Sequence, residues 1–220
     1  MDLPGNHRLT ALCGGKAARV ANPIIKSGVA LILLLCLAGS NVSLGYQKRN
    51  AAELTAISSY VKSIDQFTNR NARKRRIFGI VPEEEDKPDK WIEFKYVRQA
   101  VQANLHDSAY VWLKDGKVVA AQFSLTSSSG DWYHYVNYYF RADGTLAKIH
   151  AQLNTFASPD GGLSVVRDKF YSSSGKLLHT ATRYLDLKSQ KPRKRGDFMD
   201  QPISVYENAR DLPFLKLLRS

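Results

Sequence analysis

A hairpin signature that occurs three times is the feature that most constrains the fold of this chain. Residues 112–118 (WLKDGKV), 140–146 (FRADGTL) and 171–177 (YSSSGKL) share one form: an aromatic residue, two variable residues, Asp or Ser, Gly, Lys or Thr, and an aliphatic residue. Glycine accepts the positive φ of a tight hairpin turn, and the aromatic and aliphatic residues form a cross-strand pair beside that turn. The repeat therefore predicts three β-hairpins.

Two looser turns, at 126–131 and 157–162, join these hairpins, so the sequence predicts six consecutive strands. Their predicted bounds are 109–114, 117–125, 132–141, 145–156, 163–171 and 176–187. Short connections favour antiparallel pairing of neighbours, so the hairpin-repeat sheet over 109–187 is predicted to be a meander. Alternation at 91–96 predicts a seventh strand, and residues 201–206 are a candidate edge strand. Residues 79–90, with two prolines and an acidic run, are predicted to form an exposed loop.

The repeat resembles the YD and related β-hairpin repeats of secreted bacterial proteins. This resemblance covers the seven residues of each unit. It implies hairpins, and no function is carried over from it.

Residues 51–70 show the apolar period of an amphipathic helix, with Asn50 as its predicted N-cap and Glu53 completing a capping box. The apolar residues recur at steps of three and four: Leu54, Ile57, Val61, Ile64 and Phe67. A single apolar stripe needs a surface to cover, and we expect it to pack on the sheet; a membrane surface or a partner is the alternative. The predicted fold class is α+β, with an N-terminal amphipathic helix packed on a six- to seven-stranded antiparallel β-meander.

The first 45 residues are predicted to be an export signal that precedes a single domain over 46–220. A basic leader, an apolar run at 28–38 and small residues at Ala38 and Ser40 follow each other in the order of a signal peptide. The run is short for a membrane span, which needs about 20 residues, so a cleaved signal is favoured. The alternative is an inner-membrane anchor through 27–44. Either reading predicts a periplasmic or extracellular location.

The chain carries 32 Lys and Arg against 20 Asp and Glu, a net charge of +12. A basic exported protein suits an anionic surface or an acidic partner, and nucleic acid is not expected. The candidate contacts for such a partner are Arg73, Lys74, Arg75, Arg76, Lys194 and Arg195. The other interpretation of these clusters is a solvated surface. Because Cys13 and Cys36 both lie within the first 45 residues, the domain over 46–220 has no cysteine and is expected to have neither disulfides nor thiolate metal sites.

Two histidines are predicted to meet on the sheet. Pairing Arg141 with Thr145 across the second hairpin turn makes His134 and His150 diagonal neighbours on one face. Two imidazoles at that separation suit a shared metal ion, but no third ligand follows from the spacing, and Asp168 points to the other face in this register. No metal site is therefore assigned. The candidate ligand contacts in this region are His134, His150, Tyr138 and Lys148.

The sequence holds no nucleophile-elbow, zinc-protease or phosphate-loop motif, so no enzymatic activity and no cofactor is predicted. The predicted function is a non-enzymatic binding module whose ligand, amphipathic or lipid-like, lies in an apolar groove between the helix and the meander. The C-terminal segment 197–220 is expected to dock on this domain. One alternative is a structural or interaction protein of the cell envelope that uses its basic surfaces. A second alternative is a small pocket enzyme with His134 or His150 beside a carboxylate.

Overall fold

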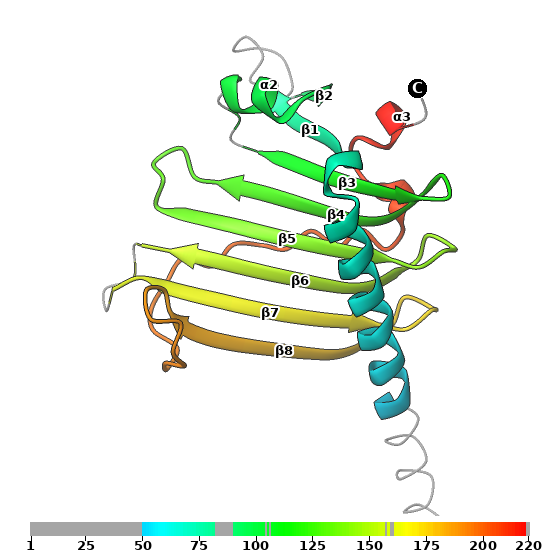
Figure 1. Ribbon diagram of the computed structural model, residues 1–220. Helices are drawn as coiled ribbons and strands as arrows, with labels where there is room; N and C mark the ends of the chain where they lie inside the picture. Colours follow the sequence, from blue (N-terminus) through cyan, green and yellow to red (C-terminus); the bar gives the residue numbers. More distant parts are fainter. Residues whose placement is uncertain are drawn as a thin grey trace, which may run out of the picture. The chain divides into compact units, whose positions relative to one another are not determined.

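Among the residues that the computed structural model describes, eight strands form one open antiparallel sheet in the order β2-β1-β3-β4-β5-β6-β7-β8 (Figure 1). The described residues are 50–81, 90–103, 105, 107–156, 158 and 161–218. They all belong to one contact unit, Tyr46–Ser220. The predicted export signal lies outside the described residues.

The hairpin repeat forms the larger part of the sheet as an antiparallel meander. Its strands are β3 (Ser108–Lys114), β4 (Lys117–Thr126), β5 (Trp132–Phe140), β6 (Leu146–Thr155), β7 (Leu163–Tyr171) and β8 (Leu177–Asp186). Positive φ values of 73°, 87° and 81° at Gly116, Gly144 and Gly175 close the three turns of the repeat. The meander predicted from these turns is confirmed.

The sheet is larger than the predicted six to seven strands, because part of the expected loop at 79–90 is a strand. Strand β1 (Arg76–Val81) pairs with β2 (Lys90–Phe94) on one side and with β3 on the other. The short helix α2 (Val97–Gln102) leads from β2 to β3. The strand was missed because a basic run precedes its apolar residues and a glycine interrupts them. Residues 201–206, the candidate edge strand, form no ladder.

Residues 50–70 are helical and cross one face of the sheet at a steep angle to the strands (Figure 1). Ile57, Val61 and Ile64 are buried against β4, β5 and β6. Their partners in this cluster are Val119, Ala120, Tyr139 and Ala147. We call this side of the sheet the helix face. A 3-10 turn, η1 (Ala72–Lys74), follows the helix and leads into β1.

Residues 187–218, which we call the strap, lie against the opposite face, the strap face (Figure 1). The strap ends in a 3-10 turn, η2 (Ala209–Asp211), and the one-turn helix α3 (Leu215–Leu218). Phe214 is 1% exposed and stacks on Phe78 of β1, with ring centroids 4.4 Å apart. The Tyr138 hydroxyl donates to the Ser204 carbonyl at 2.8 Å. The strap therefore closes the largest core cluster of the described chain.

The strap also docks on the second hairpin turn. The Ala209 amide donates to the Gly144 carbonyl at 2.8 Å, and the Leu146 amide donates to the Glu207 carbonyl at 2.9 Å. A Cβ placed on Gly144 would lie 3.0 Å from Oδ1 of Asn208, the oxygen that caps η2. Glycine at this position therefore serves both the turn and the approach of the strap.

Gly144→Ala is expected to destabilise the protein more than Gly175→Ala does. Both variants place a side chain at a positive φ, which costs about 1–2 kcal/mol. Only the Gly144 variant also forces Asn208 to move, and this steric clash lowers the free energy of unfolding by about a further 1–3 kcal/mol. A Cβ at Gly175 meets open space. Urea unfolding of the two variants measures the difference in free energy. Equal losses of unfolding free energy in the two variants would show that Asn208 and the strap move aside at no cost.

Candidate functional site

The histidines predicted to be neighbours lie on opposite faces of the sheet. The amide of Arg141 donates to the Thr145 carbonyl, as the predicted turn requires, but a register shift follows between Tyr139 and Phe140. His150 therefore lies opposite Asn137, and His134 lies opposite Leu153. Because side chains alternate with a period of two, one extra residue moves a strand's side chains to the other face. The prediction of a histidine pair was wrong for this reason.

His134 and Tyr138 belong to the strap face, in the protein interior. His134 is 1% exposed, and burial, together with the charge of Arg167, lowers the pKa of its imidazole to about 4. Tyr138 is 2% exposed. Both candidate ligand contacts therefore act as core residues beneath the strap.

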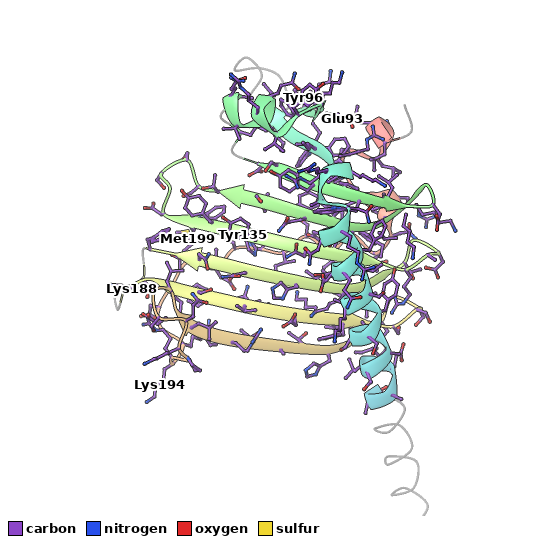
Figure 2. The ribbon with its side chains drawn as sticks, viewed as in Figure 1. Glu93, Tyr96, Tyr135, Lys188, Lys194 and Met199 are labelled. Atoms are coloured by element: carbon purple, nitrogen blue, oxygen red, sulfur yellow. The ribbon has the colours of Figure 1, made fainter. Side chains whose placement is uncertain are left out.

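The four basic residues predicted to form one surface at 73–76 lie in different environments, and only two of them are exposed. Arg76 donates to both carboxylate oxygens of Glu93 and to carbonyls near the end of the strap. Arg73 and Lys74 are exposed, whereas Arg75 is half-buried on the helix face. The other basic candidates, Lys194 and Arg195, are exposed on the strap. Figure 2 shows Lys194 near the end of β8.

A cavity of about 330 Å³ lies on the helix face, between the end of the helix and strands β3 to β5. Ligand sites in proteins measure about 300–1,000 Å³, so this volume suits a small molecule. The helix and the turn after it supply Asp65, Asn69 and Arg75 to the lining. The strands supply Tyr110, Trp112, Gln122 and Asn137. The lining is thus polar and aromatic.

Two buried hydrogen-bond donors in this lining have no acceptor among the described residues. They are Nε of Arg75 and Nε1 of Trp112. The Arg75 guanidinium is held in place, because it lies 4.4 Å from the ring centroid of Tyr110 and its Nη1 donates to the Ala72 carbonyl. An unpaired buried donor costs about 1–3 kcal/mol. Each donor would be satisfied by a ligand whose hydrogen-bond acceptor reaches it once the groups that cover it have moved aside.

Asp65 gives the same cavity an acceptor. Its Oδ1 accepts a hydrogen bond from the Tyr139 hydroxyl at 2.9 Å. Burial, and then the charge of Asp65, raise the pKa of Tyr139 above its ordinary value, so this phenol stays protonated and keeps donating. The site therefore offers a fixed carboxylate to ligand donors and a guanidinium and an indole to ligand acceptors.

A charged cluster continues on the helix face beyond the cavity, where β6, β7 and β8 run side by side. Oδ1 of Asp168 lies 2.9 Å from Nδ1 of His150 and 2.7 Å from Nζ of Lys148, and Arg183 lies 3.7 Å from Oδ2. Burial acts to raise the pKa of Asp168, but the hydrogen bonds from His150 and Lys148 outweigh it and hold this pKa well below its usual range. The carboxylate is therefore charged and orients the imidazole. Asp168 was expected on the other face; that prediction was wrong, because β7 pairs with β6 so that Asp168 lies directly opposite His150.

The part of the chain that the structure describes brings together no group of three or more His, Cys, Asp or Glu side chains suited to a metal ion. Within the same ranges, no helix is long and apolar enough to cross a membrane. Comparison with protein-family models, with curated proteins and with solved structures finds no match to this chain.

Sequence reasoning missed most of the cavity, since Trp112 was interpreted as a hairpin aromatic and Asp65 as part of the polar side of the helix. One signal was available in the strands. Gln122, Asn137 and His150 each lie near the middle of a strand, on the side opposite its most apolar residues. Polar residues in the middle of adjacent strands, beneath an amphipathic helix, indicate a polar site.

Proposed function

We propose that this protein is a non-enzymatic binding module that holds a small polar ligand between the helix over 50–70 and the helix face of the sheet. The observation that carries the proposal is that Arg75 and Trp112, two residues that line one cavity, each hold a buried donor without an acceptor among the described residues. A carbonyl, carboxylate or hydroxyl oxygen of the ligand accepts from them. Asp65 accepts from a donor of the same ligand.

The chemistry of the lining favours a polar ligand over the lipid-like one expected from the sequence. An alkyl chain needs apolar walls, because burying a polar group without a partner is costly. Here the walls carry a carboxylate, a guanidinium and three amides, those of Asn69, Gln122 and Asn137. The apolar stripe of the helix is already covered by the sheet.

Binding accounts for this site better than catalysis does. A general acid or base works best when its pKa lies near the working pH. Tyr139, whose pKa is raised, keeps its proton at neutral pH. We place this binding module outside the cytoplasm, as the export signal predicted over 1–45 implies. The envelope-protein alternative remains a prediction that rests on the exposed basic residues.

Trp112→Phe is expected to weaken the binding of a polar ligand by about tenfold or more, because it removes one buried donor and keeps most of the ring. The measurement is a titration followed by the indole N–H signals of the three tryptophans in a ¹H–¹⁵N spectrum. The probes are N-acetylglucosamine, glucose, glutamate and, for the lipid-like alternative, dodecanoate. A bound polar probe shifts the Trp112 signal and leaves those of Trp91 and Trp132 in place.

Trp132→Phe is the matched control, since Trp132 packs in the cluster on the strap face. This variant should bind the polar probe as the original protein does. A Trp112 signal that moves with dodecanoate alone would contradict a polar ligand. A signal that moves with none of the four probes would count against a binding cavity at this place.

A further inference from the structure

A row of polar side chains runs from the cavity straight across the sheet. Its members lie directly opposite one another on five adjacent strands, β3 to β7: Tyr110, Gln122, Asn137, His150 and Asp168. Four strand spacings of about 4.8 Å give the row a length of about 19 Å. Its first three members line the cavity, and its last two belong to the charged cluster. The two parts of the helix face are thus one continuous polar feature.

The helix lies along one side of this row. It packs against the neighbouring row of the sheet, at Ala120, Tyr139 and Phe170. On the other side, β5 presents Tyr133 and Tyr135, whose rings are 42% and 37% exposed (Figure 2 labels Tyr135). The row therefore has a helix on one flank and exposed aromatic rings on the other.

We infer that the cavity is one end of an extended site and that the ligand is a linear oligosaccharide lying across the strands. This inference rests on the proposed function and names the ligand class for it. Each sugar hydroxyl both donates and accepts a hydrogen bond, and so do the amides, phenol and imidazole of the row. At one end of the row Arg75, which lies over Tyr110, offers donors, and at the other end Lys148 beside Asp168 offers a donor next to an acceptor. The exposed tyrosine rings provide flat surfaces for sugar rings.

Other chain molecules fit this row less well. A peptide that adds a strand needs a free sheet edge, and β3 to β7 are each paired on both sides. A helical peptide needs an apolar groove, which a row of amides and charged groups does not provide. A nucleic acid needs cations along its phosphates, whereas this row consists of a phenol, two amides, an imidazole and the carboxylate of Asp168.

The test is a titration of the full chain with N-acetylglucosamine and its linear β-1,4-linked oligomers up to the hexamer, with the matching glucose oligomers as a second series. We expect the hexamer of one series to bind at least about tenfold more tightly than its monomer, since added subsites contribute further hydrogen bonds. The monomer should shift the Trp112 indole signal. The hexamer should shift that signal and also the backbone amides around His150.

His150→Ala separates the extended site from the cavity. The variant is expected to weaken hexamer binding by about tenfold and to leave monomer binding unchanged. His179→Ala is the matched control, because His179 lies on β8 opposite Phe170, outside the polar row. It should bind both sugars as the original protein does. His150→Gln, which keeps a hydrogen-bonding side chain, should retain part of the hexamer affinity and excludes misfolding as the cause of the loss.

Each adverse outcome identifies which claim fails. A hexamer that binds no more tightly than the monomer, or equally well to His150→Ala, overturns the extended site while the Trp112 shift sustains the cavity. A Trp112 signal that moves with glutamate and with no sugar overturns the oligosaccharide and leaves the proposed function standing. A signal that no probe moves overturns both.

Discussion

Phe214→Ala is expected to lower the free energy of unfolding by about 3–5 kcal/mol, the usual cost of removing a fully buried phenylalanine ring. The ring stacks on Phe78 and lies 5.1 Å from Trp91 and 5.6 Å from Phe123, centroid to centroid. Three aromatic partners from β1, β2 and β4 would therefore border the cavity left behind. The midpoint and slope of urea unfolding, followed by tryptophan fluorescence, measure the loss.

Met199→Ala is the matched control for this prediction. Met199 belongs to the same strap but is 74% exposed, so its truncation is expected to change stability by less than about 0.5 kcal/mol. A loss below about 1 kcal/mol for Phe214→Ala would show that the strap contributes little to the core. In that case the strap would be an appendage of the sheet.

Stability is also expected to fall as the pH drops from 6.5 to about 4, because of His134. The imidazole pKa is about 4 in the folded protein and 6.5 ordinarily, since burial and Arg167 disfavour the charged form, while Asp200 acts in the opposite direction. As the pH falls, the unfolded chain takes up the proton first, so the folded state loses about 1.4 kcal/mol for each pH unit in this window. The total loss is about 3 kcal/mol. Asp168, whose pKa is held below 3.8, adds its own loss only at lower pH.

His134→Leu is expected to remove most of this pH dependence, and His179→Leu, at an exposed position, should leave it unchanged. The measurement is urea unfolding at a series of pH values between 7 and 4. The imidazole signals of the folded protein provide a second readout, in which His134 stays neutral down to about pH 4. A His134 signal that titrates near its ordinary pKa would contradict the burial argument.

The meander was predictable because its information is local. An aromatic residue, Asp or Ser, and Gly within seven residues determine each turn of the repeat, and the strands extend outward from those turns. Strand β1 was not predictable in this way. Its burial depends on β3 and on Phe214, which lies more than 130 residues further along the chain. A pattern within β1 itself therefore does not indicate that such a distant residue will cover it.

The sequence indicated several residues of the candidate site but not which face of the sheet each of them lies on. Sequence reasoning selected His150, Lys148 and Arg75, all of which lie on the helix face. It also selected His134 and Tyr138, which lie on the strap face, whereas the extra residue Ala147 in β6 moves His150 to the helix face. A bulge costs little energy and has no fixed sequence signature, yet it changes the face of the residues beyond it. The exposure of the basic residues Lys194 and Arg195 followed from their charge alone.

The strap has a consequence for the order in which the fold completes. Arg76 and Phe78 lie on β1, the first strand of the sheet in sequence order. Their partners, Leu217 and Phe214, are among the last residues of the described chain to be synthesised. The strap face of the growing sheet therefore keeps its aromatic surface open to the surroundings until translation has passed Phe214. Contacts between distant parts of a sequence also slow folding. Apolar surface that stays exposed during folding favours aggregation, so this face is the part of the nascent chain that most needs cover before the strap arrives.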